Sequence, residues 1–400
     1  MAFVHTVRMR SHDARHPGPK PKPPIQANDV RGAKYLRNIM DLLRPLRTHK
    51  DCTNRTLHYD EYVAYLLLYF FNPVVTSMRG LQQVSTLEEV RGKLGLPRFS
   101  LGSFSEARNV FDPSLLEPLL AQLLAEASEA GADRRLTALN LTPTVVDSTM
   151  LRALPKMLWA FWRTGNVHAV KVHLEYSLLK SAPSRATITP ARRPDGRVLS
   201  EQLTAGKLYV LDRGYTDYVL MASILAAGSS FVVRLQHHVE TKMIEERAVG
   251  AAARRRGVVS DKTVRLGSKK KQALWDRQIR LVEVRIPTRD GGKPTTLLLA
   301  TDRLDFDAEL VADLYRYRWQ IELFFRWFKT ILGAGRLLAL SENGVRLVVY
   351  CALIASLLLT VWTGRKPTKR TYEMLCLYFL GWAQEHELVA HIEGLSPAVV

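Results

Sequence analysis

The sequence predicts an α/β protein, in which a helical N-terminal region precedes a mixed sheet with helices. Apolar residues recur at three- and four-residue spacing from about Val30 to Gly131, a pattern typical of amphipathic helices. After Gly131 come short segments rich in β-branched residues, which are typical of strands. A chain of 400 residues, 47% of them hydrophobic, can bury a core and form more than one domain.

The N-terminal part divides into an arm and a set of helices. Residues 1–30 contain PGPKPKPP, in which proline prevents helix and sheet interiors, so we expect a flexible basic arm. The helical segments expected after the arm are 32–46, 59–71, 86–94, 102–111 and 114–129.

Residues 86–111 resemble a helix-turn-helix. The first helix would end near Gly95, and the second would begin near Ser103. The residues that the second helix would offer to DNA are Ser103, Ser105, Arg108 and Asn109. We therefore expect an all-α DNA-binding domain over 31–131, and an ordinary helical hairpin with solvated polar residues is the alternative.

Strands are predicted next, together with a helix over 216–228 that ends at Gly228. Because this helix joins two strands, it implies a parallel pair within the mixed sheet. The predicted strands are 142–149, 168–179, 185–191, 207–214 and 230–236.

A polar and basic segment follows, which contains the arginine run 254–256 and the lysine run 269–271. We expect a basic β-rich insertion over 237–290, with strands predicted at 277–287 and 295–302. The other predicted regions are the first part of a core at 132–236, its second part at 291–364, and a helical C-terminal region at 365–400.

The charge balance points to a polyanionic partner. The chain has 57 Lys and Arg against 38 Asp and Glu, which gives a net charge of +19. Nucleic acid is the commonest such partner, and an anionic membrane surface is the alternative. The uncharged segment 347–362 is shorter than the roughly 20 residues that span a bilayer, so we expect a buried core helix there.

Two further observations bear on the class of protein. Cys52, Cys351 and Cys376 lack CxxC spacing, so they indicate neither a disulfide framework nor a zinc site. The N-terminus has no apolar run of the secretory kind, so we expect a cytoplasmic protein with no membrane partner.

Three acids occupy unusual positions. Asp147 follows the apolar run TVV and Asp212 follows LYVL, where a charge costs stability unless it has a partner. Either aspartate alone could simply cap a turn. A third acid, Glu322, lies in a predicted helix that begins near Asp307. Its sequence at 314–329, LYRYRWQIELFFRWFK, is otherwise basic, aromatic and apolar apart from one glutamine.

That helix has two different faces. At about 100° per residue, its apolar residues form a broad face that we expect to pack on the core. A narrow polar stripe beside this face contains Tyr315, Arg318, Glu322, Arg326 and Lys329. An i,i+4 pair of Arg318 with Glu322 would explain part of the stripe, but not a single acid among so many bases.

The three acids suggest a metal site. Carboxylate oxygens suit Mg²⁺, and two such ions about 4 Å apart can clamp a phosphodiester. The basic neighbours would neutralise phosphates, and the aromatic rings could stack on an unpaired base.

The spacing of Tyr315, Arg318, Glu322 and Lys329 resembles the Tyr-Arg-Glu-Lys (YREK) signature of a large subgroup of bacterial insertion-sequence transposases of the DDE class. Three further segments resemble the same family: VDST at 146–149, HAVKVH at 168–173 and VLDRGY at 210–215. The resemblance covers about 140–363.

The resemblance implies an RNase H-like catalytic core that a β-rich insertion interrupts between the second aspartate and the glutamate. Asp147, Asp212 and Glu322 would be the catalytic and metal-binding triad, with two Mg²⁺ ions, or Mn²⁺ in their place. Such an enzyme cleaves the terminal inverted repeats of its element by hydrolysis and joins the freed 3′-OH to target DNA. It works as a homodimer on double-stranded DNA, here at the bacterial nucleoid in the cytoplasm.

The resemblance also implies that Tyr315, Arg318 and Lys329 hold phosphates near the transposon terminus. Trp319 would stack on a displaced base, and ordinary packing is its alternative role. The other expected DNA contacts are Arg326, Lys171, His173, Arg213, Tyr215, Arg108 and Asn109. For the two residues of the HAVKVH segment, plain surface positions on a strand are the alternative.

Other functions fit parts of the sequence. A metal-dependent nuclease would use the same acids without strand transfer, and a domesticated DNA-binding protein would need only the basic surfaces. The basic arm and helical N-terminal region favour binding to transposon ends, and the intact acids favour an enzyme. A membrane-associated protein would rest on 347–362 alone.

Overall fold

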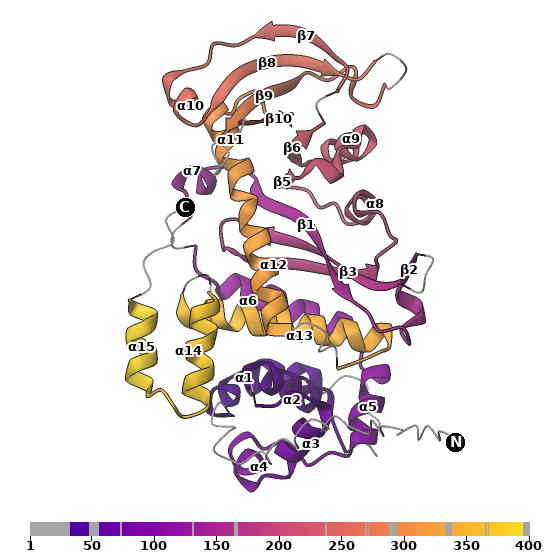
Figure 1. Cartoon of the computed structure of the whole chain (residues 1–400), viewed down its shortest axis with the longest axis vertical. Helices are drawn as coiled ribbons and strands as arrows, with labels where there is room; N and C mark the ends of the chain where they lie inside the picture. The colour runs from indigo at the N-terminus through magenta and orange to yellow at the C-terminus, as the bar shows by residue number, and fades with distance from the viewer. Residues whose placement is uncertain are drawn as a thin grey trace, which may run out of the picture.

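Figure 1 shows a computed structural model in which N-terminal helices lie at one end and a long sheet extends to the other. The described residues are 33–47, 56–72, 74–129, 132–163, 167–236, 238–268, 270, 272–287, 294–332, 338–364, 366 and 368–394. The predicted basic arm at 1–30 and Cys52 lie outside the described residues.

Helices precede the first strand of the sheet. They are α1 (Ala33–Arg47), α2 (Tyr59–Phe71), α3 (Met78–Thr86), α4 (Glu88–Leu94), α5 (Leu101–Val110), α6 (Glu117–Glu126) and α7 (Arg134–Thr137). Gly95 ends α4 with a φ of 66°, and the Ser100 side chain caps α5 by accepting a hydrogen bond from the Ser103 amide. The expected helix, turn and helix are therefore present, and their contact with DNA stays a prediction.

A mixed sheet of ten strands forms the centre of the protein. Its order is β2-β3-β1-β5-β6-β10-β9-β8-β7, and β4 pairs with β3 outside this path. The strands are β1 (Thr142–Arg152), β2 (Phe161–Arg163), β3 (Val167–Ser177), β4 (Ala182–Pro190), β5 (Lys207–Leu211), β6 (Ser230–Leu235), β7 (Thr241–Glu246), β8 (Val258–Leu266), β9 (Ile279–Ile286) and β10 (Thr295–Thr301).

The middle of the sheet contains the predicted parallel unit. β5 and β6 are parallel and joined by α9 (Tyr218–Ala226), as the sequence predicted, and β1 is parallel to β5 on the other side. Strand β3 runs antiparallel to β1. Side chains alternate across β1, so Val145 belongs to one apolar core and Val146 to a second core on the opposite face.

The strands of the basic segment continue the same sheet. β10 pairs with β6 on one edge and with β9 on the other, so β9, β8 and β7 extend the central sheet outward. The buried Arg280 side chain on β9 makes two hydrogen bonds to Asp261 on β8, of 2.8 and 2.6 Å, and also donates to the Phe306 carbonyl. This pair therefore ties the outer strands to the loop that precedes the next helix.

The helix predicted to begin near Asp307 is interrupted once. Asp307 is indeed the N-cap, but the segment forms α11 (Ala308–Tyr317) and α12 (Trp319–Leu332) with a break at Arg318. Its backbone hydrogen bonds close over three residues there, from Arg318 N to Tyr315 O at 3.2 Å and from Ile321 N to Arg318 O at 3.1 Å, which tightens the turn. The predicted apolar face is buried at Leu314, Ile321, Phe324, Phe325 and Phe328.

Helices form the C-terminal part of the described chain. They are α13 (Glu342–Thr363), α14 (Lys369–Phe379) and α15 (Glu385–Glu393). Within the described residues, α13 alone is long and apolar enough to cross a membrane, but 89% of its most apolar window is buried inside the protein. Figure 1 places α13 between the N-terminal helices and the sheet. It is thus a core helix, as the sequence predicted.

Candidate active site

Two of the three predicted acids lie side by side on neighbouring parallel strands. The parallel register pairs Val146 of β1 with Leu211 of β5, so Asp147 and Asp212 are the next residues on each chain segment. Asp212 directly follows the last residue of β5, as the sequence predicted. Asp147 was predicted at a strand end, but β1 continues to Arg152 because its second half pairs with β3, so Asp147 lies in the middle of that strand.

Arg318 links the third acid to this pair. Helix α12 packs against β1 and carries Glu322. The Arg318 guanidinium donates to Glu322 Oε1 at 2.5 Å and to Asp147 Oδ2 at 3.3 Å. One half-buried cation therefore bridges an acid on the helix and an acid on the sheet.

Tyr315 and Arg234 surround the second aspartate. The Tyr315 hydroxyl donates to Asp212 Oδ1 at 2.8 Å, and Arg234 Nη1 on β6 lies 3.8 Å from the same oxygen. The Arg318 guanidinium carbon lies 5.5 Å from the centre of the Tyr315 ring, within cation–π range. The polar stripe that the sequence predicted on this helix thus faces the acids.

The acids influence one another electrostatically. Burial raises the pKa of the Asp147 carboxyl to about 6, and the charges of Asp212 and Glu322 add to this rise. The Ser148 amide, which donates to Asp147 Oδ1 at 2.8 Å, and the charge of Arg318 act in the opposite direction. Asp147 is therefore a carboxyl held in a site with surplus negative charge.

Asp212 behaves differently from its neighbour. Burial by itself would raise its pKa, but hydrogen bonds from the Arg213 backbone and the Tyr315 hydroxyl lower it. The charges of Arg318 and Arg234 lower it further, so the net shift of the Asp212 pKa is downward. The two aspartates thus have pKa values shifted in opposite directions.

The three acids match a hard divalent cation in charge and ligand chemistry. Carboxylate oxygens are the preferred ligands of Mg²⁺, and surplus negative charge is what such a cation relieves. Within the part of the chain that the structure describes, no three His, Cys, Asp or Glu side chains stand close enough to hold a metal ion as placed. Arg318 supplies the balancing positive charge between Asp147 and Glu322.

The outer residues of the predicted stripe, Arg326 and Lys329, are exposed to solvent. Trp319, which was predicted to stack on a base, is 49% exposed. Arg213, next to Asp212, is exposed as well, whereas Tyr215 is buried behind it.

Lys171 and His173 project from β3 into a buried polar cluster. His173 Nδ1 lies 3.1 Å from Asp195 Oδ1 and its Nε2 lies 2.9 Å from the Thr189 hydroxyl, while Lys171 Nζ lies 3.2 Å from Asp195 Oδ2. Burial would raise the pKa of Asp195, but hydrogen bonds from His173 and Ser148 lower it to about 2. The predicted DNA contacts of Lys171 and His173 stay predictions.

Sequence reasoning missed Asp195 and Arg234. Asp195 begins α8 (Asp195–Ser200) and lies next to Ser148, the neighbour of Asp147 in β1. No sequence pattern marks this aspartate. Arg234, in contrast, interrupts the apolar run of β6, and a charge within a buried strand is the signal that could have revealed it.

The predicted helix-turn-helix contacts lie at the other end of the molecule. Asn109 is exposed, and Arg108 is half-buried against the start of α13. The Asn343 side chain donates to the Arg108 carbonyl at 2.7 Å. Figure 1 shows α5 well apart from the strand ends that carry the acids.

The part of the chain that carries the three acids matches a known family. Residues 140–358, more than half of the chain, match the transposase DDE domain. The chain therefore belongs to the transposase DDE domain family, and its three predicted acids all lie inside the matched region.

Two curated relatives are similar to this chain. A protein of Sinorhizobium fredii, assigned as transposase y4zB, is 33% identical over 224 residues, which are 54% of this chain and 60% of that protein. The chain thus aligns with less than two thirds of that relative. A protein of Geobacillus stearothermophilus, assigned as the transposase for insertion sequence element IS5377, is 28% identical over 76% of this chain and 78% of its own length.

Among solved structures, a cryo-EM synaptic complex of piggyBac transposase with hairpin DNA is similar over 94% of this chain and 84% of that chain. The TM-score is 0.41 and the sequence identity is 11%.

Proposed function

We propose that this protein is the transposase of a bacterial insertion sequence and belongs to the YREK subgroup. The observation that carries the proposal is the meeting of three acids from distant segments. Asp147 and Asp212 lie side by side on adjacent parallel segments, and Arg318 links Glu322 to Asp147. The family match, which names the transposase DDE domain, supports the same activity.

Asp147, Asp212 and Glu322 would hold two divalent cations, Mg²⁺ or Mn²⁺. Bound there, such cations would activate an attacking oxygen and stabilise the leaving oxygen of a phosphodiester. The hydrogen bond from Tyr315 is one of the contacts that lower the pKa of the Asp212 carboxyl, and it thereby favours the charged form that would bind a cation. Arg318 holds Asp147 and Glu322 close together through its two ion pairs. It would turn toward a phosphate once cations balance the carboxylates.

The reaction would begin with hydrolysis of DNA at a terminal inverted repeat. The freed 3′-OH would then attack target DNA and join the element to it. Exposed Trp319 would stack on a displaced base, and Lys329, Arg326 and Arg213 would bind nearby phosphates. Tyr315 and Arg318 would hold the phosphate nearest to the acids.

The regions predicted from the sequence receive roles within this proposal. The arm at 1–30 and the helices of 31–131 would bind the inverted repeats, with Arg108 and Asn109 on the second helix of the helix-turn-helix. The parts at 132–236 and 291–364 would form an RNase H-like core, which the basic β-rich segment at 237–290 interrupts. A homodimer would bring two transposon ends together in the bacterial cytoplasm, and 365–400 would add a helical C-terminal region.

A cleavage assay with Glu322→Gln tests the proposal. Wild-type protein, Mg²⁺ and DNA that carries the terminal inverted repeats should give a cut at the repeat boundary, followed by joining to a target plasmid. Glu322→Gln should lower the cleavage rate by at least about a hundredfold, because it removes a charged ligand of the cations. Glu309→Gln, in the first turn of α11, is the matched control and should cut normally.

Three results would contradict parts of this proposal. Absence of any cut by wild type would exclude the assigned function, and cleavage by Glu322→Gln at the normal rate would exclude the assigned site. A wild-type protein that cuts but never joins the 3′-OH to target DNA would be the nuclease alternative. Binding without either reaction would indicate the non-catalytic DNA-binding alternative.

A further inference from the structure

A cluster of arginines lies where three elements that are distant in sequence meet. We call it the arginine junction, and its members come from α7, from α10 (Ala251–Arg255) with its C-cap, and from α11. They are Arg134, Arg135, Arg254, Arg255, Arg256 and Arg316. Figure 1 shows α7 and α10 beside α11. The arginine run 254–256, which the proposed catalytic site does not use, is part of this junction.

One buried carboxylate organises the centre of the junction. Asp313 on α11 is 1% exposed and lies 2.8 Å from Arg135, 3.4 Å from Arg256 and 3.3 Å from Arg316. Asp133 is the second carboxylate, 2.6 Å from Arg135. The three arginines share two acids while their side chains remain 40%, 47% and 55% exposed, so each is fixed at one side and open to solvent at the other.

The other three arginines have no acid of their own. Arg134, Arg254 and Arg255 are exposed and form no ion pair with any described residue. Six arginines and two carboxylates give the junction a charge of 6 − 2 = +4.

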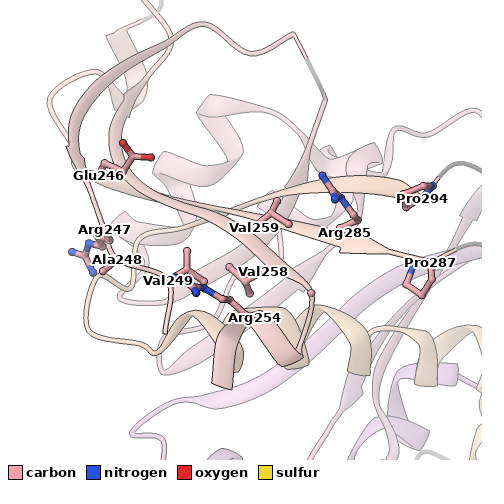
Figure 2. Close-up of a pocket in the computed structure, with 11 residues that line it drawn as sticks. Glu246, Arg247, Ala248, Val249, Arg254, Val258, Val259, Arg285, Pro287 and Pro294 are labelled. Atoms are coloured by element: carbon pink, nitrogen blue, oxygen red, sulfur yellow. The ribbon is translucent and has the colours of Figure 1, made fainter. Parts of the chain in front are cut away.

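A hollow adjoins the junction on the outer strands. Figure 2 shows this hollow, whose volume is about 1060 Å³, with Arg247, Arg254 and Arg285 along it and Glu246 as the acid among its described lining residues. Arg254 belongs to both the hollow and the junction. The positive surface therefore continues from α10 onto the outer part of the sheet.

The place and chemistry of this surface indicate its partner. Arginine presents a planar fork that matches phosphate oxygens, and fixed guanidinium groups lose little entropy when they bind them. Asp313 and Arg316 of the junction lie on α11, the helix whose Tyr315 hydroxyl binds Asp212, so one helix carries part of the junction and part of the candidate site. We expect a DNA duplex with its reacting phosphate at those acids to pass along this helix, which would bring further backbone phosphates to the junction.

We propose that the arginine junction binds backbone phosphates of the transposon-end duplex beyond the cleavage site. This inference rests on the proposed function and adds to it a second, non-catalytic DNA surface. The junction reads no base sequence, because it offers charge and phosphate geometry only. It adds phosphate contacts to the same DNA end whose terminus enters the catalytic site.

Salt-dependent binding tests the inference through the double variant Arg254→Ala/Arg255→Ala. Both side chains are exposed and form no ion pair within the described part of the chain, so the variant should have the circular dichroism spectrum and melting temperature of wild type. The affinity for a duplex that carries the inverted repeat is measured by fluorescence anisotropy over a range of salt concentrations. The slope of log K against log salt should fall in magnitude by about 2 relative to wild type, since two phosphate contacts are lost.

The matched control removes the same charge from another surface. Lys369→Ala/Arg370→Ala takes two exposed positive charges from α14, which Figure 1 shows far from α10. Its slope should stay within about half a unit of the wild-type slope. A double variant at the junction whose slope equals that of this control would overturn the inference.

Two further outcomes separate the possible explanations. If the variant binds the end duplex like wild type but a preassembled protein–end complex then captures target DNA poorly, the junction would belong to target DNA and the assignment to the transposon end would be wrong. If wild type itself neither binds nor cuts the end duplex, the proposed function fails, and this result differs from a defect confined to the variant.

Discussion

Arg318 is the residue on which the geometry of the candidate site depends most. It contacts two acids that lie far apart in the chain, Asp147 and Glu322. The contact with Glu322 is the i,i+4 pair that the sequence suggested. The contact with Asp147 exists only because α12 packs on β1. Removing Arg318 would leave Asp147 and Glu322 close together without a balancing charge.

The raised pKa of Asp147 gives a prediction at the same scale. A carboxyl whose folded pKa lies above its unfolded value favours folding below about pH 4, and this contribution is lost as pH rises through 6. Without metal, Asp147→Asn should therefore be more stable than wild type by about 2–3 kcal/mol at pH 7.5 and equal to it near pH 4. The same variant should lose cleavage, because it lacks a carboxylate that would bind the cations. The charge that destabilises the fold is therefore the charge that the reaction needs.

Urea unfolding in the presence of EDTA at the two pH values measures this difference. Asp276→Asn, at an exposed position, is the control and should change stability by less than about 0.5 kcal/mol at either pH. An Asp147→Asn protein that is less stable than wild type at pH 7.5 would contradict the electrostatic account of this carboxyl.

At the scale of elements, sequence patterns located most of the helices and strands of the described chain. Segment 59–71 is α2, and the predicted strands lie on β1, β3, β4, β5, β6, β9 and β10. The pattern missed α3, whose sequence MRGLQQVST has few apolar residues, and β7, all of whose residues are exposed. It also missed the strands β2 and β8 and the short helices α7, α8 and α10. Helix α3 is held by packing, and β7 by pairing with β8, which local periodicity does not report.

Gly257 allows a prediction for the turn that connects α10 to β8. Its φ is 85°, and a Cβ atom there would lie 2.5 Å from the Arg285 carbonyl oxygen. Gly257→Ala should therefore cost about 2–4 kcal/mol, since it combines a left-handed backbone with a clash against a backbone atom. The urea midpoint of unfolding measures this loss.

Gly92 in α4 is the matched control for that substitution. A Cβ atom at Gly92 would meet nothing within 4 Å, and the residue lies inside a helix. Gly92→Ala should stabilise the protein by about 0.5–1 kcal/mol. Equal effects of the two alanines would show that the conformation described for Gly257 is wrong.

At the scale of the whole molecule, α13 joins the N-terminal helices to the sheet. Its Asn343 side chain donates to the carbonyls of Arg108 and Phe111 at the end of α5, each at 2.7 Å. Asn343→Ala should lower the free energy of unfolding by about 1–2 kcal/mol, because it leaves both carbonyls without this partner. Asn109→Ala changes an exposed residue of α5 and should have little effect in the same urea titration.

If Asn343→Ala unfolds like the Asn109 control, these two hydrogen bonds do not contribute to the stability of the interface. If it broadens the transition into two steps, α13 would couple two separately folding parts, which bears on the predicted boundary near residue 131.

The sequence by itself determined the strands that carry the two aspartates, the end of β5 before Asp212 and the amphipathic helix, because these features depend on periodicity and on the cost of an unpaired charge. It also determined that 347–362 would be a core helix and that Asp307 would begin the helix with Glu322. Tertiary structure alone decided that Asp147 and Asp212 are adjacent, that Arg318 bridges two acids, and that Asp195 lies behind the site. It also decided that β7–β9 extend the central sheet and that arginines from three segments share Asp313. These are contacts between residues tens to hundreds of positions apart, and hydrogen bonds between strands and the packing of helices on them fix such contacts, whereas local patterns do not.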